Sequence, residues 1–132
     1  MANLLLVDDD LDMVDAFADV LRAEGHSVRM ATNGREGLAR LAEEKPDLII
    51  CDVEMPIMSG PDMAMEIFLG DAGRELIPIL LSSGVVDLPR VAARVGTPYF
   101  LGKPFTFQQL TDLLARALAE RRPPRPEGLA GR

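Results

Sequence analysis

Five polar side chains that are able to bind a cation or a phosphoryl group stand at the ends of short apolar runs. Asp8 and Asp9 follow the first run, Asp52 the second, Ser83 the third, and Lys103 the fourth. Three carboxylates in one cleft repel one another, so the pKa of at least one rises unless a cation neutralises them. These residue types therefore predict a divalent cation site if the fold brings the carboxylates together.

Magnesium is the cation that this set of side chains favours. Mg²⁺ binds through one or two carboxylates and keeps positions for water and phosphate oxygens. Beside such an ion, the Asp52 carboxylate could attack phosphorus and form an aspartyl phosphate. The Lys103 ammonium and the Ser83 hydroxyl would then contact phosphoryl oxygens. Asp8, Asp9, Ser83 or Lys103 alone is commonly a turn or surface group. Asp52 is harder to explain in this way, because it directly follows an apolar run and has Pro56 and Gly60 downstream. The prediction depends on all four run ends together.

The apolar runs are expected to be strands of a parallel sheet. Unbroken runs of this kind are typical of strands buried on both faces. They cover Leu4–Val7, Leu48–Cys51, Ile77–Leu81 and Tyr99–Leu101, and the more polar Val28–Ala31 is expected at an edge. The carboxyl ends of parallel strands share one edge, where ligands bind. The predicted sheet would therefore bring the five polar side chains together.

Helical patterns fill the segments between these runs. The apolar spacing of Val14, Phe17, Ala18 and Leu21 predicts one amphipathic helix. Other helix starts are indicated at Asn33 with Glu36, Gly60-Pro61, Asp87 to Pro89, and Thr106 with Gln109. Strand and helix thus alternate five times, which predicts an α/β fold with a doubly wound parallel sheet covered by helices on both faces.

Length and composition limit the possible functions. The chain has 132 residues, of which 48% are hydrophobic, and a formal net charge of −7. This size fits one domain, and the negative charge argues against nucleic-acid or anionic membrane surfaces. The single cysteine, Cys51, allows no internal disulfide. Because no segment is typical of a signal peptide or a membrane span, a cytoplasmic location is expected.

The last twelve residues differ in composition from the rest of the chain. Residues 121–132 are rich in proline and arginine and have no apolar periodicity. Such composition is typical of disordered or extended segments. We therefore expect a domain over residues 1–120, followed by a disordered or extended tail.

In order and spacing, the chain resembles the receiver domain of two-component response regulators, particularly single-domain, chemotaxis-regulator-like ones. The resemblance covers residues 3 to about 119. Five matching pieces carry it: Leu4–Asp10, Pro46–Asp52, Met55–Gly60, Pro78–Gly84 and Lys103–Phe105. It implies a flavodoxin-like (βα)5 fold with strand order 2-1-3-4-5.

The resemblance also implies residue roles. Asp52 would be the phosphoacceptor, and Asp9, Asp8 and the backbone carbonyl of Glu54 would help it bind Mg²⁺. Ser83, Phe100 and Lys103 would form the phosphoryl contact and switch set, and the bond before Pro104 would be cis. The hydroxyl position usually carries threonine, and a slip of one residue would select Ser82 in place of Ser83.

Two other functions compete with a phosphorylated receiver. A pseudo-receiver would bind partners without ever carrying phosphate, although all the acidic and lysine positions are present. A phosphatase of the haloacid dehalogenase type would also use an aspartate nucleophile, with Glu54 as its second carboxylate. Pro56 breaks the loop that such a phosphatase needs, and the chain has no cap domain.

The partners follow from the receiver hypothesis. A histidine kinase or a histidine phosphotransfer protein would donate the phosphoryl group to Asp52, and a downstream protein would bind the changed surface. The chain has no room for a DNA-binding or enzymatic output domain, so the expected output is protein–protein binding or onward transfer in a phosphorelay. The chain is expected to be a monomer or a phosphorylation-dependent dimer. It would not be an enzyme with a separate substrate.

Overall fold

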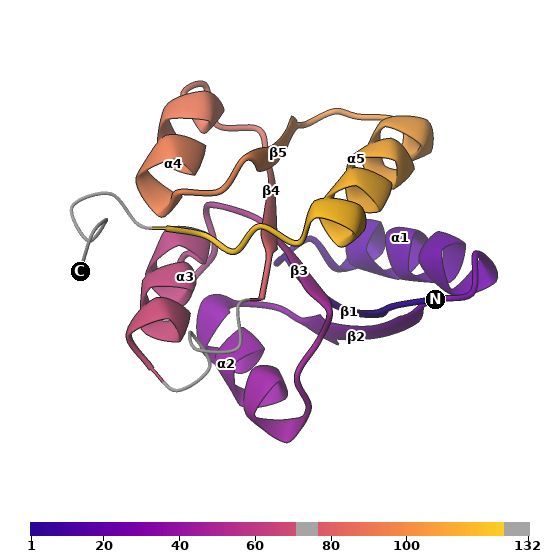
Figure 1. The fold of residues 1–132 in the computed structure, drawn as a ribbon, viewed down its shortest axis with the longest axis horizontal. Helices are drawn as coiled ribbons and strands as arrows, with labels where there is room; N and C mark the ends of the chain where they lie inside the picture. Colours follow the sequence, from indigo (N-terminus) through magenta and orange to yellow (C-terminus); the bar gives the residue numbers. More distant parts are fainter. Residues whose placement is uncertain (71–76, 126–132) are drawn as a thin grey trace.

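The computed structural model describes residues 1–70 and 77–125 of the chain. Five strands form one parallel sheet in the order β2-β1-β3-β4-β5, and helices alternate with them along the chain (Figure 1). The strands are β1 Asn3–Val7, β2 Ser27–Ala31, β3 Leu48–Cys51, β4 Ile79–Ser83 and β5 Tyr99–Gly102. The helices are α1 Leu11–Ala23, α2 Gly34–Glu43, α3 Gly60–Leu69, α4 Leu88–Val95 and α5 Phe107–Glu120. The predicted fold class and strand order are confirmed.

Helices cover both faces of the sheet, and each face has its own core. Figure 1 shows α1 and α5 together on one side, with α2, α3 and α4 on the other. Alternate residues of a strand point to opposite faces, so Leu4 and Leu6 pack toward α1 and α5 while Leu5 and Val7 pack toward α2 and α3. Burial on both faces explains why the central strands are continuous apolar runs.

The strand boundaries differ from the predicted runs at β4. The apolar run begins at Ile77, but the strand begins at Ile79 and continues through Ser83. Pro78 has no backbone N–H to donate to a neighbouring strand, although its carbonyl accepts a hydrogen bond from the Ile49 N–H. The polar run Val28–Ala31 lies in the edge strand β2, as predicted.

Side chains cap most of the helices as their sequences indicate. Thr106 and Gln109 form a complete capping box at α5. Asn33 caps α2 through the Glu36 N–H, but the Glu36 carboxylate accepts a hydrogen bond from the Thr32 hydroxyl. Asp87 precedes α4 without a side-chain capping hydrogen bond, so the start of that helix lacks one stabilising contact.

The chain leaves α5 at Arg121, which adopts a left-handed backbone conformation with φ 51°. Beyond it, the Arg122 N–H donates to the Tyr99 hydroxyl and the Arg125 N–H donates to the Gly96 carbonyl. Pro124 is buried. The first five residues of the expected tail are thus packed against the ends of α4 and β5, and residues 126–132 lie outside the described residues.

In the two described segments, no helix is long and apolar enough to cross a membrane.

Candidate functional site

Backbone hydrogen bonds fix the positions of three predicted site residues just beyond the ends of the strands. The N–H of Asp8 donates to Ala31 and that of Asp52 donates to Val7, each at 3.0 Å. The Lys103 N–H likewise donates to the Ser83 carbonyl at 2.9 Å. The sheet ladder therefore continues past each strand, and rigid backbone holds the side chains at one edge.

Three carboxylates meet at this edge. Each of Asp8, Asp9 and Asp52 offers an oxygen, and these oxygens lie within 4.8 Å of one another. Asp8 and Asp52 are buried, whereas Asp9 is exposed to solvent. Two buried carboxylates with a third open to water form an oxygen-rich set that suits a hard cation and leaves it room for other ligands. The donor chemistry thus fits Mg²⁺.

Lys103 is the cation that faces this cluster. Its Nζ lies 2.8 Å from Asp8 Oδ2 and 3.5 Å from Asp52 Oδ2. Burial alone would lower the pKa of the Lys103 ammonium, but the hydrogen bond and charge of Asp8, with the charge of Asp52, outweigh burial and raise the pKa. Lys103 therefore stays protonated and holds positive charge beside Asp8 and Asp52.

The second oxygens of the two buried aspartates bind backbone donors. Asp8 Oδ1 accepts a hydrogen bond from the Asp10 N–H at 3.0 Å. Asp52 Oδ1 accepts one from the Val53 N–H at 2.7 Å. Burial still raises the pKa of Asp8, against the lowering effect of Lys103 and the Asp10 N–H. Burial therefore disfavours the charged form of Asp8, and a bound cation would favour it.

Cys51, next to Asp52, faces the core. It is fully buried, and burial together with the charges of Asp52 and Asp8 raises the pKa of its thiol. A thiol in this setting is a poor nucleophile.

Ser83 is the serine that shares a cavity with Asp52. Asp52, Glu54 and Ser83 line a cavity of about 430 Å³ together with Gly84 and Val85. The hydroxyl oxygen of Ser83 accepts a long hydrogen bond, 3.4 Å, from the Val85 N–H. Ser82 is one strand position earlier and so points to the opposite face of the sheet. The geometry therefore favours Ser83 over Ser82 as the hydroxyl near Asp52.

The remaining predicted positions lie on or after β5. Phe100 pairs with Leu81 in the strand register, and 38% of its surface is exposed. No contact between Phe100 and Asp52 is recorded among the described residues, so its switch role remains a prediction. The Lys103–Pro104 peptide bond is cis, as the resemblance implies.

An aromatic cluster beside Lys103 was not foreseen from the sequence. The Phe17 ring lies 5.1 Å from the ring of Phe105 and 5.1 Å from that of Phe107. Phe17, Lys103 and Phe105 also line an apolar cavity of about 370 Å³. The two phenylalanines on either side of Thr106 were the one indication of this cluster in the sequence. Local sequence does not indicate that Phe17 of α1 packs against them.

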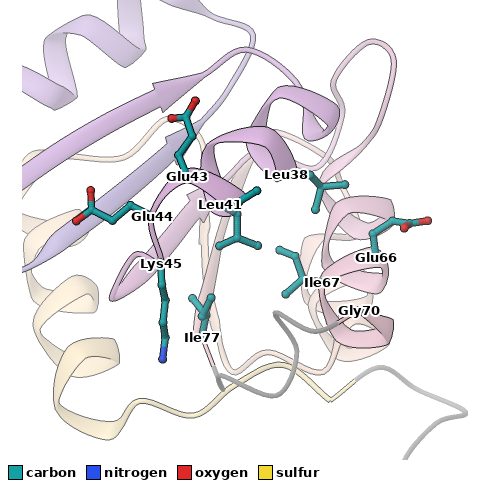
Figure 2. A pocket seen from close by; sticks show the side chains of 10 residues that line it. Leu38, Leu41, Glu43, Glu44, Lys45, Glu66, Ile67, Gly70 and Ile77 are labelled. Atoms are coloured by element: carbon teal, nitrogen blue, oxygen red, sulfur yellow. The ribbon is translucent and has the colours of Figure 1, made fainter.

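A further cavity, of about 440 Å³, lies away from the acidic cluster between α2 and α3. Figure 2 shows Leu38 and Leu41 facing Ile67 across it, with Glu43 and Glu66 at its margins. Gly70 and Ile77, which flank the undescribed residues 71–76, also line it. None of the predicted site residues reaches this cavity.

The fold and the site together define the class of doubly wound α/β proteins with a ligand site at the carboxyl edge of the sheet. A doubly wound α/β domain holds three carboxylates and a lysine at the carboxyl edge of its sheet, where such folds bind ligands.

The chain belongs to the response regulator receiver domain family, whose model matches residues 4–115. It is 34% identical over 122 residues to the transcriptional regulatory protein ZraR of Salmonella typhimurium, covering 91% of this chain and 27% of that protein. The chain thus spans about a quarter of the length of such relatives.

Solved structures agree with this fold. A CheY-like receiver domain protein from Methanospirillum hungatei superposes with a TM-score of 0.82 at 24% identity, covering 92% of this chain and 96% of that one. The chemotaxis response regulator CheY4 of Vibrio cholerae gives a TM-score of 0.79 at 30% identity, covering 88% and 98%. Family membership identifies the chain as a signalling module of the two-component type.

Proposed function

We propose that Asp52 accepts a phosphoryl group in a Mg²⁺-dependent reaction and that this changes a protein-binding surface. The observation that carries the proposal is that Asp52 lies in one cluster with two other carboxylates and within 3.5 Å of the Lys103 ammonium. Buried negative charge of this density is costly without a cation. A site that combines metal ligands, a nucleophilic carboxylate and a lysine suits phosphoryl transfer.

Asp8, Asp9 and Asp52 would hold the ion through their carboxylates, with the Glu54 carbonyl as a further ligand. Magnesium, when bound, supplies positive charge that offsets the charge on the transferred oxygens. Asp52 Oδ2 attacks phosphorus, the bond to the donor nitrogen breaks, and the electron pair leaves with the donor imidazole. Lys103 then contacts a phosphoryl oxygen, for which its position 3.5 Å from Asp52 Oδ2 is suited.

Ser83 would couple phosphorylation of Asp52 to a conformational change in the rest of the fold. Its hydroxyl shares the cavity with Asp52, and its present hydrogen bond with the Val85 N–H is long. A phosphoryl oxygen is a strong acceptor for the Ser83 O–H, so the hydroxyl turns toward it and its oxygen gives up the long hydrogen bond that it accepts from the Val85 N–H. The segment before α4 then changes its population of conformations, and Phe100 repacks next to it on β5.

The donor would be a histidine kinase or a histidine phosphotransfer protein, and the output would be binding to a downstream protein. Relatives of this chain are named as transcriptional regulatory proteins and as a chemotaxis response regulator. The chain acts on no separate substrate in this proposal.

Phosphorylation of the purified protein tests the proposal. We expect acetyl phosphate or phosphoramidate to add one phosphoryl group by intact mass, only when Mg²⁺ is present, and not in Asp52→Asn. Wild type without any mass gain, and with the same amide NMR response to Mg²⁺ and beryllofluoride as Asp52→Asn, would instead identify a pseudo-receiver.

A further inference from the structure

The segment Arg121–Arg125, which we call the C-terminal strap, ties together the ends of three elements. The Arg122 N–H donates to the Tyr99 hydroxyl at 3.2 Å, and that hydroxyl donates to Glu120 at the end of α5. The Arg125 N–H donates to the Gly96 carbonyl at 3.0 Å. Figure 1 shows the strap, in yellow, crossing from α5 toward α4. It therefore links α5, β5 and the carboxyl end of α4.

The strap fits closely against the end of α4. Gly96 follows the helix in a left-handed conformation, with φ 81°. A Cβ at this position would collide with the backbone of Arg125, including its carbonyl oxygen. Pro124 is buried beside this contact, and prolines favour an extended backbone with little conformational freedom. The carboxyl end of α4 is thus held by a short, stiff segment.

The amino end of α4 is less firmly fixed than its carboxyl end. Asp87 makes no side-chain hydrogen bond to the first turn, so an ordinary stabilising contact is missing. The segment before it starts at Ser83, whose hydroxyl binds Val85 at 3.4 Å, and Val86 is 98% exposed. This end therefore lies next to the candidate phosphorylation site and is the easier end to move.

We propose that the C-terminal strap is a clamp that holds α4 in its unphosphorylated position and opposes the displacement that follows phosphorylation of Asp52. The effect on phosphorylation rests on the proposed function, whereas the restraint of α4 by the strap does not. With its carboxyl end fixed at Gly96, α4 moves by pivoting there, and larger displacement requires release of the Arg125–Gly96 hydrogen bond. Because coupling between two sites is reciprocal, a released strap favours the phosphorylated conformation.

Arg125→Pro removes the donor that binds Gly96, because proline has no backbone N–H. Its neighbours are already Pro124 and Pro126, so an extended backbone is retained. Arg125→Ala is the matched control, since it removes the same side chain and charge and keeps the N–H. Tyr99→Phe releases the strap at its other anchor without changing residues 121–125.

Amide hydrogen exchange of the full chain without phosphate tests the clamp itself. The N–H groups of Gly96 and Thr97 donate to the Ala92 carbonyl in the last turn of α4. We expect exchange at these two amides to rise about threefold to tenfold in Arg125→Pro, as the loss of one hydrogen bond allows. Arg125→Ala should match wild type. Unchanged exchange in both Arg125→Pro and Tyr99→Phe would overturn the clamp.

Titration with beryllofluoride in the presence of Mg²⁺ tests the coupling. We expect Arg125→Pro and Tyr99→Phe to reach half saturation at a lower concentration, by about threefold to tenfold, with Arg125→Ala unchanged. Equal or weaker binding in the released variants would overturn the coupling. Absence of any response in wild type would overturn the proposed phosphorylation of Asp52, while the exchange result on the clamp would stand.

Discussion

The ammonium nitrogen of Lys103 lies 2.8 Å from Asp8 Oδ2, closer than its 3.5 Å approach to Asp52 Oδ2. Lys103 and Asp8 are 95 positions apart in the chain. The lysine therefore neutralises Asp8 more than Asp52. A divalent cation at Asp8 and Asp9 would compete with Lys103 for the Asp8 carboxylate, so lysine and metal are alternative positive partners of that side chain.

Lys103→Met tests this competition. Loss of the ammonium removes a competitor from Asp8, so we expect the dissociation constant for Mg²⁺ to fall by about tenfold. It also leaves a buried carboxylate unpaired, which should lower the free energy of unfolding without Mg²⁺ by about 2 kcal/mol. The chain contains no tryptophan, so NMR shifts at the cluster would follow Mg²⁺ binding and circular dichroism would follow unfolding.

Lys103→Arg is the control, because it keeps the positive charge on a different head group. Its affinity for Mg²⁺ should stay much nearer to wild type. Weaker Mg²⁺ binding in Lys103→Met than in wild type would contradict the competition.

Ser83→Ala tests which serine acts as the switch hydroxyl. We expect Asp52 to accept a phosphoryl group in this variant while the NMR shifts of Val85 and α4 that accompany beryllofluoride binding largely disappear. Ser82→Ala should keep those shifts, because Ser82 points away from the cavity that Asp52 lines. Ser83→Thr retains the hydroxyl and should restore the response. A lost response in Ser82→Ala, with a normal one in Ser83→Ala, would reverse the assignment.

The single tyrosine gives a pH prediction for the strap anchor. Burial raises the pKa of Tyr99 above its ordinary value of 10.0. Since the folded pKa is the higher one, the stabilising contribution is complete below pH 10 and is lost as pH rises through the raised pKa. The tyrosinate absorbance of the folded protein should therefore titrate later than that of the denatured protein.

Tyr99→Phe should lose less stability at alkaline pH than wild type does, because it has no phenol to ionise. Comparison of wild type and Tyr99→Phe by chemical denaturation at pH 9 and above would measure this difference. Tyrosinate titration in the folded protein at or below the denatured value would contradict the buried, hydrogen-bonded phenol.

Much of the site was predictable because its geometry follows from strand ends. Asp8 and Asp52 each come directly after a buried strand, and a parallel sheet places such residues at one edge. The capping box of Thr106 and Gln109 was predictable for a similar reason, since it depends only on local spacing.

Contacts that depend on how surfaces meet could not be read from the sequence. Nothing in the composition of residues 121–132 indicates that Arg125 donates to Gly96, 29 positions earlier, because a proline-rich segment has no apolar period to show a packed face. The distances from the Lys103 ammonium to Asp8 and to Asp52 differ by less than an ångström. Residue spacing in the sequence does not indicate which of the two carboxylates is closer.

Gly60, the first residue of α3, lies so close to the backbone of Asp52 that a substitution there affects both stability and site geometry. A Cβ there would collide with the Asp52 carbonyl and approach Cys51 Sγ at 3.3 Å. Helix propensity alone favours alanine over glycine, but the colliding group is backbone and has no other rotamer. We therefore expect Gly60→Ala to lower the free energy of unfolding by about 2 kcal/mol or more.

Gly102→Ala is the matched control for Gly60→Ala, because apart from its chain neighbours no atom of the described residues would lie within 4 Å of a Cβ at position 102. Its free energy of unfolding should stay within about 0.5 kcal/mol of wild type. Denaturant unfolding measures both variants, and phosphorylation by acetyl phosphate should be slowed in Gly60→Ala alone, because Asp52 must shift. Equal stability and equal phosphorylation of Gly60→Ala and wild type would mean that the loop moves aside freely, and the rigid placement of Asp52 argued from its backbone contacts would then be wrong.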